Sequence, residues 1–76
     1  MLIDFRVYNP GGVKVCVYDI MGQEIEKLVD QNYVAGNYQV PWNGKNRFGD
    51  TVGNGTYFVL IQSPDGHMVR PVIVLK

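Results

Sequence analysis

The residues that could do chemistry in this 76-residue chain gather in one stretch, WNGKNRFGDTVGNGTY, which runs from Trp42 to Tyr57. Four of the nine glycines and three asparagines lie between its two aromatic ends. The backbone N–H groups of a glycine-rich loop can cradle a phosphate, and side-chain oxygens can ligate calcium. Phosphate binding and calcium binding are therefore the two chemistries that this stretch raises.

The stretch lacks the partners that either chemistry requires. A P-loop continues from Gly-Lys into Ser or Thr and then into a helix, whereas Asn46 follows Lys45 here and no helical pattern comes next. A calcium loop of the EF-hand type needs several carboxylates and a closing glutamate, and Asp50 is the only carboxylate present. We therefore expect no cofactor and no metal site. The sequence leaves one question open, namely whether the loop from Asn43 to Asp50 binds any ligand weakly.

The same composition predicts a structural corner that turns the chain between two sheets. Asn43-Gly44 and Asn54-Gly55 are turn dipeptides, because glycine adopts positive φ freely and asparagine tolerates it. Asparagine side chains can also bond backbone groups that have no partner in a sheet. Trp42 and Tyr57 are then expected to point inward as anchors at the two ends of the corner.

Outside this stretch, chemically capable side chains are few and separate. A nucleophilic pair of Cys16 with His67 is conceivable, but a partly covered strand cysteine and a solvated histidine beside a turn glycine are the commoner outcome. Four aromatic residues could form a platform that stacks on a sugar ring: Tyr8, Tyr18, Tyr33 and Phe48. They come from separate elements, and no nucleophile, base and oxyanion donor occur together. The sequence predicts that the protein is not an enzyme.

Length and composition limit the classes of protein to which this chain can belong. Hydrophobic residues make up 46% of the chain, enough for the core of one small domain. Seven basic residues balance seven acidic ones, so the basic stripe that nucleic acid or an anionic membrane requires is absent. The lone Cys16 excludes an internal disulfide and a zinc site built from cysteines. No apolar run is long enough to span a membrane.

Alternation of apolar and polar residues predicts strands along most of the chain. The inward-facing residues are expected to be Ile3, Phe5, Val7, Val13, Val15, Val17, Tyr38, Val40 and Trp42. Residues Glu24 to Val29 have helical spacing but no caps, and we expect a short, irregular strand there. Thr56 to Gln62 is apolar on both faces, which predicts a central strand covered on each side. Met68 to Leu75 contains Pro71, which predicts an edge or bulged strand.

Turn signals separate these strands. NPGG (Asn9 to Gly12) and SPDG (Ser63 to Gly66) are turn sequences, the second typical of a type I hairpin turn. DIMGQ (Asp19 to Gln23) predicts a hairpin in which Gly22 takes a positive φ. Pro41 lacks an N–H, so it either points its nitrogen away from a neighbouring strand or marks an edge. Six to seven short strands without a convincing helix predict an all-β fold, an antiparallel sandwich.

The order of these motifs resembles a family of bacterial immunoglobulin-like modules. The family pattern is V-x-V-Y-D-x-x-G, then a W-[DN]-G loop, then G-x-Y leading into an apolar strand. The matching residues are Val15, Val17, Tyr18, Asp19, Gly22, Trp42, Asn43, Gly44, Gly49, Val52, Gly55 and Tyr57. The family includes domains related to the immunoglobulin-like part of the flagellar hook-capping protein and the C-terminal sorting domains of type IX secretion cargo. The match runs from Ile3 to Lys76 and implies an immunoglobulin-like sandwich.

The resemblance also implies a role. Residues 1–76 are expected to be a single module, the C-terminal domain of a longer exported protein, located outside the cell or on its surface. It would be a non-catalytic sorting or anchoring module with protein partners, monomeric in isolation. A flagellar hook-assembly scaffold and a carbohydrate-binding module of a secreted hydrolase are the alternatives. The expected partner-binding residues lie on the last strand and are Met68, Arg70, Val72, Val74 and Lys76, with Arg70 and Lys76 facing outward.

Overall fold

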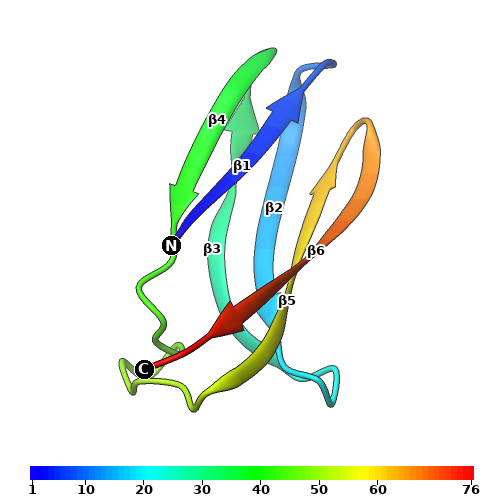
Figure 1. The fold of residues 1–76 in the computed structure, drawn as a ribbon. Coiled ribbons are helices and arrows are strands. Elements are labelled where there is room, and N and C mark those ends of the chain that lie inside the picture. The colour runs from blue at the N-terminus through cyan, green and yellow to red at the C-terminus, as the bar shows by residue number, and fades with distance from the viewer.

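Six strands follow one another along the chain. They are β1 (Leu2–Val7), β2 (Gly11–Tyr18), β3 (Glu24–Tyr33), β4 (Gly36–Pro41), β5 (Gly55–Ser63) and β6 (Gly66–Val74) (Figure 1). The computed structural model describes every residue from Met1 to Lys76. No helix is present, so none is long and apolar enough to cross a membrane.

The strands form two antiparallel sheets. A small sheet pairs β1 with β4, and a large sheet has the order β3-β2-β5-β6. The small sheet packs on one face of the large sheet, with β4 in contact with β3 (Figure 1). The prediction of an all-β, antiparallel, immunoglobulin-like sandwich is confirmed, with six strands.

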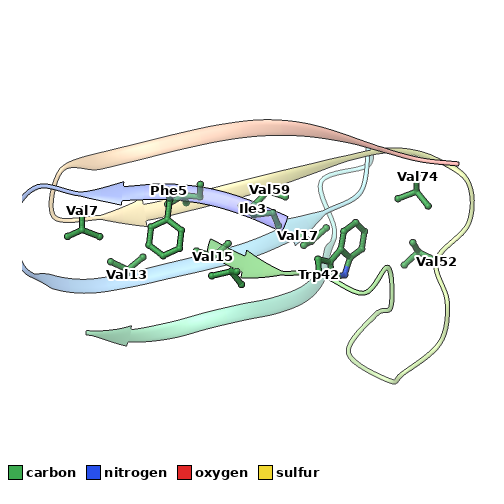
Figure 2. Close-up of a cluster of buried hydrophobic side chains, with 12 residues drawn as sticks. Ile3, Phe5, Val7, Val13, Val15, Val17, Trp42, Val52, Val59 and Val74 are labelled. Carbon is green, nitrogen blue, oxygen red and sulfur yellow. The ribbon is translucent and has the colours of Figure 1, made fainter. Parts of the chain in front are cut away.

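The core lies between the two sheets and is apolar throughout. Its twelve buried residues are Ile3, Phe5, Val7, Val13, Val15, Val17, Val40, Trp42, Val52, Val59, Ile61 and Val74. Trp42 lies toward the end of the sandwich where Val52 and Val74 also lie (Figure 2). No polar or charged residue is buried. The alternation therefore predicted the inward faces of β1 and β2 correctly.

The turn after β1 is shorter than the sequence predicted. Gly11 and Gly12 already belong to β2, which leaves three residues, numbers 8–10, to cross between the sheets. At Gly11, with a φ of +155°, an added Cβ would lie 2.6 Å from Cγ of Pro64. This close approach of the β5–β6 hairpin explains why a glycine opens the strand.

Strand β3 has ten residues, so the prediction of a short strand ending at Val29 was wrong. Its irregularity is confirmed, because the register with β2 shifts twice. The shifts leave Ile25 and Leu28 as extra residues of β3 without a direct partner on β2. Together with Val29 they pack against the core. Two bulges therefore produce the spacing that resembles a helix.

Strand β5 is central, between β2 and β6, as predicted. Val59 and Ile61 are buried on its inner face. Phe58 and Leu60 lie on the opposite face and are only half-buried, since nothing packs over that side of the large sheet. The prediction that β5 is covered on both faces was therefore wrong for its outer face.

Candidate functional site

The corner loop, residues 42–54, connects β4 of the small sheet with β5 of the large sheet, as predicted. Trp42 has 1% of its surface exposed, and its indole N–H donates to the carbonyl oxygen of Lys45 at 2.9 Å. Its ring meets Tyr57 edge to face, with the centroids 5.6 Å apart. The Tyr57 hydroxyl donates to the carbonyl oxygen of Gly53 at 2.8 Å. Both residues are thus inward anchors of the loop.

The asparagine side chains of the corner loop bond to its own backbone. Asn46 Oδ1 accepts from the N–H groups of Phe48 and Asp50, at 2.9 and 3.0 Å. Asn43 Oδ1 accepts from the N–H of Lys45 at 3.1 Å. The two acceptor sites of Asn46 Oδ1 are filled, so this oxygen has none left for a cation. The predicted bonding of asparagine side chains to the loop backbone is therefore confirmed for Asn43 and Asn46. The turns take positive φ only at glycines, among them Gly44 and Gly55.

Contacts from both sides hold the corner loop in place. The Arg47 backbone N–H donates to the carbonyl oxygen of Ile25 at 3.0 Å, and its guanidinium donates to Glu24 Oε2 at 3.0 Å. Near the other end of the loop, Lys76 Nζ donates to the carbonyl oxygen of Val52. These contacts fix the loop against β3 and the last residue of the chain, which is a structural role. No cluster of three or more His, Cys, Asp or Glu side chains in the chain could hold a metal ion.

The β2–β3 hairpin is built by Asp19 and Gly22. Asp19 Oδ1 accepts from the N–H groups of Met21 and Gln23, both at 2.9 Å. Gly22 has a φ of +83° and donates its N–H to the carbonyl oxygen of Asp19 at 3.0 Å. Both motif residues hold the turn, as the sequence indicated.

Cys16 and His67 do not form a pair. Cys16 lies opposite Leu60 and His67 opposite Gln62, so β5 stands between them. Two strand spacings amount to roughly 10 Å, beyond hydrogen-bond reach. Burial and a hydrogen bond with Glu24 raise the pKa of the Cys16 thiol to about 11. His67 is exposed and lies at the start of β6 rather than in the turn itself.

The four aromatic residues considered for a sugar platform do not gather on one face, as their separate elements indicated. Tyr33 packs against Phe5 on the inner side, with ring centroids 5.5 Å apart. Tyr18 lies on the outer face of the large sheet, opposite Phe58. The remaining two, Tyr8 and Phe48, are exposed at the end of β1 and in the corner loop. The platform is therefore not formed.

The last strand has a different orientation from the one expected. Arg70 lies opposite Val59, whose side chain is fully buried, so Arg70 faces the small sheet and the prediction that it faces outward was wrong. Val74 belongs to the core, with 6% of its surface exposed. Lys76 bonds to the corner loop. Of the expected partner-binding residues, Met68 and Arg70 are exposed and Val72 is half-buried.

One polar contact was not foreseen from the sequence. Asp65, in the β5–β6 turn, accepts from the backbone N–H groups of Tyr8 at 2.9 Å and Asn9 at 3.2 Å, and from Asn9 Nδ2 at 2.8 Å. These bonds, the one from Tyr8 foremost, lower the pKa of the Asp65 carboxyl. No local sequence signal marks the contact, because Asp65 and Tyr8 are 57 positions apart.

Comparison with known proteins adds no relative to this picture. No family model, no curated protein and no solved structure matches the chain.

Proposed function

We propose that the protein is a non-catalytic sorting or anchoring module at the C-terminus of an exported or cell-surface bacterial protein. The observation that carries the proposal is the free outer edge of β6, which pairs with β5 alone. An edge with unpaired backbone groups can take up a strand of a partner protein. The motif order from Val15 to Tyr57, which resembles the sorting domains of type IX secretion cargo, supplies the biological setting.

The backbone of β6 determines which groups a partner would meet. Pro71 lies opposite Phe58 and has no N–H, so its nitrogen takes a position that faces the free edge. Because the direction of hydrogen bonding alternates along an antiparallel strand, Val69 and Ile73 turn their N–H groups to the same edge. Their side chains are 58% and 66% exposed. The free edge therefore offers N–H donors on both sides of a gap at Pro71.

A binding role agrees with the way the recognisable motifs are used. The polar atoms of Asp19, Trp42 and Asn46 all bond to backbone groups of their own turns. Such bonds fix the shape of the module and leave its edges as the surfaces with unpaired backbone groups.

The experiment is a fusion of residues 1–76 behind a signal peptide and a neutral reporter, in a host with type IX secretion machinery. We expect the reporter on the cell surface or in the medium. Ile73→Pro removes one N–H from the free edge without breaking a bond to β5, and should stop export. Ile73→Thr keeps that N–H and is the matched control, which should still be exported. Circular dichroism of the purified modules checks that both variants are folded.

Retention of the folded wild-type fusion in the periplasm would contradict the sorting role. It would move the flagellar hook-assembly scaffold to first place among the alternatives. A carbohydrate-binding role has less support, because Tyr18 and Tyr33 lie on different faces of the large sheet.

A further inference from the structure

Two five-residue turns of the chain have the same structure. One is DIMGQ (Asp19 to Gln23), between β2 and β3, and the other is NRFGD (Asn46 to Asp50), in the corner loop. Each begins with Asp or Asn and has a glycine as its fourth residue. The glycine takes a positive φ in both, +83° at Gly22 and +85° at Gly49. The β2–β3 turn and the corner loop lie at the same end of the sandwich (Figure 1), and we name the two segments the twin turns.

The hydrogen bonds of the twin turns also match. The first residue donates its N–H to the carbonyl oxygen of the fifth, at 3.0 Å in the β2–β3 turn and 2.9 Å in the corner loop. The glycine N–H donates to the carbonyl oxygen of the first residue at 3.0 Å in both. Oδ1 of the first residue accepts from the N–H groups of the third and fifth residues, at 2.9 to 3.0 Å. Four of the five N–H groups are thus bonded within each turn.

Each of the twin turns exposes a large apolar side chain at its third position. These side chains are Met21 and Phe48, and each has 81% of its surface exposed. Ile20, beside Met21, is 71% exposed, and Leu75, which follows β6 at the same end of the molecule, is 83% exposed (Figure 1). The four most exposed large hydrophobic residues of the chain therefore lie at one end. Turns ordinarily carry polar residues, so these four apolar side chains need another explanation.

The bonded backbone allows the twin turns to leave water. An N–H group that enters an apolar phase without a partner costs several kcal/mol in hydrocarbon, whereas a bonded one does not. In the corner loop the remaining N–H group of the turn, that of Arg47, donates to the carbonyl oxygen of Ile25 at 3.0 Å. The side chains of Met21 and Phe48 can therefore enter an apolar phase on turns that keep their hydrogen bonds.

The charges at this end of the molecule balance. Residues 19–24, 43–52 and 75–76 include three acidic and three basic side chains, namely Asp19, Glu24, Asp50, Lys45, Arg47 and Lys76. Arg47 and Glu24 form an ion pair at 3.0 Å. An anionic bilayer attracts clusters of basic residues, and a charged partner protein attracts the opposite charge. Neither attraction is available here, so apolar contact must supply the affinity.

The exposed side chains of the twin turns suit a fluid surface better than a folded partner. Neither Met21 nor Phe48 lines a cavity of the structure. A folded partner protein binds through a contiguous, closely packed patch in which anchoring side chains fill pockets. The surface of a lipid bilayer takes up apolar side chains between its lipids, and binding grows with the apolar area buried.

We propose that this end of the molecule binds the surface of an electrically neutral lipid bilayer through the twin turns. Met21 and Phe48 enter the boundary between headgroups and acyl chains, and Ile20 and Leu75 add apolar area beside them. The twin turns lie outside β6. The inference therefore does not rest on the proposed function, and either can fail without the other.

The test is flotation of the purified module with vesicles of phosphatidylcholine alone. Half of the protein should float at about millimolar lipid, because two apolar side chains supply most of the affinity. Met21→Ser and Phe48→Ser should each raise the lipid concentration at half-flotation about tenfold. Val34→Ser is the matched control, because Val34 is 70% exposed in the β3–β4 turn at the opposite end (Figure 1), and it should float like the wild type. Added phosphatidylserine or salt should change little.

A tryptophan probe provides the second measurement. With the same vesicles, the emission of Phe48→Trp should move to shorter wavelength and be quenched by lipids brominated on their acyl chains. Val34→Trp should show neither change, and the buried Trp42 gives the same background in both variants.

Three results would overturn the proposal. The first is a wild-type protein that does not float with phosphatidylcholine vesicles. The second is flotation that requires phosphatidylserine and disappears in salt, which would assign the binding to charge. The third is a Val34→Ser variant that loses as much affinity as Met21→Ser and Phe48→Ser. The wild-type result decides the matter even if a variant does not fold.

Discussion

At the scale of single residues, Trp42 is the largest of the fully buried side chains. Truncating it to alanine costs about 3–5 kcal/mol, against about 4–11 kcal/mol of total stability for a chain of this length. We therefore expect Trp42→Ala to be marginal or unfolded in a denaturant titration followed by circular dichroism. Phe48→Ala, in the same loop and with Phe48 81% exposed, is the control. It should shift the stability by less than about 0.5 kcal/mol. An unchanged midpoint for Trp42→Ala would contradict its anchoring role.

Cys16 shows how burial suppresses a reactive group. Burial first, and then the Glu24 carboxylate, raise the pKa of its thiol from the ordinary 9.0 to about 11. The thiolate is the reactive form, so an aromatic disulfide reagent at neutral pH should modify the folded protein far more slowly than the unfolded one. Fast modification of the folded protein would contradict this assignment.

The same shift has a consequence for stability at high pH. Between pH 9 and about 11 the thiol of Cys16 ionises in the unfolded chain but stays protonated in the folded one. The unfolded state then binds fewer protons, so the free energy of unfolding falls as the pH rises through this window. Cys16→Ala should show a smaller fall than the wild type over this window in chemical denaturation. If the free energy of unfolding falls equally in both proteins, the pH dependence comes from groups other than Cys16.

At the scale of elements, Asp65 ties the β5–β6 turn to the end of β1. The hydrogen bonds from Tyr8 and Asn9 lower the pKa of its carboxyl. A lowered pKa means that the stabilisation is complete above the ordinary value of 3.8 and is lost as the pH falls through the lower, folded value. Asp65→Ala should therefore lower the melting temperature at neutral pH, and the difference from wild type should shrink in acid. Asp50→Ala, whose carboxylate makes no such bond, is the control and should melt like the wild type. If Asp65→Ala and the wild type have equal melting temperatures at neutral pH, the hydrogen bonds of Asp65 do not stabilise the fold.

The corner loop makes a prediction about ligands. The oxygen of Asn46 is occupied by backbone N–H groups, and Asp50 is the only carboxylate between Trp42 and Tyr57. Calcium, magnesium and phosphate should each leave the melting temperature unchanged, because a ligand stabilises only by binding the folded state. A saturable rise at millimolar calcium that disappears in Asp50→Ala would show that the loop is a binding site.

Local patterns predicted those elements whose side chains alternate regularly. Strands β1 and β2 follow the alternation, and the Asp19 and Gly22 hairpin follows from turn chemistry. Strand β3 was misjudged because the bulges at Ile25 and Leu28 break the two-residue period. A bulge depends on the partner strand, so a single strand's sequence carries little sign of it.

At the scale of the whole molecule, the unequal sheets decide which surfaces are open. The sequence indicates the number of strands but not their division into two and four. The orientation of Arg70 depends on that division, since the face it shares with Val59 is covered by β1 only in part. The contact of Asp65 with Tyr8 likewise joins segments far apart in the chain. Local sequence patterns therefore could not predict them.

The open edges also make a prediction about self-association. Sheet edges pair with one another unless something blocks them, and on β6 the block is Pro71, which leaves a gap between the N–H groups of Val69 and Ile73. We expect the wild-type module to sediment as a monomer over a wide concentration range. Pro71→Val restores the missing N–H and adds a β-branched side chain, so the variant should associate as its concentration rises.

Pro64→Ala is the matched control for the loss of a proline, because Pro64 lies in the turn and leaves the edge of β6 unchanged. It should remain monomeric in the same sedimentation velocity series. If Pro71→Val also stays monomeric while folded, the edge of β6 is closed by something other than its proline. A partner strand would then have to dock at another free edge, such as that of β1, which pairs with β4 alone.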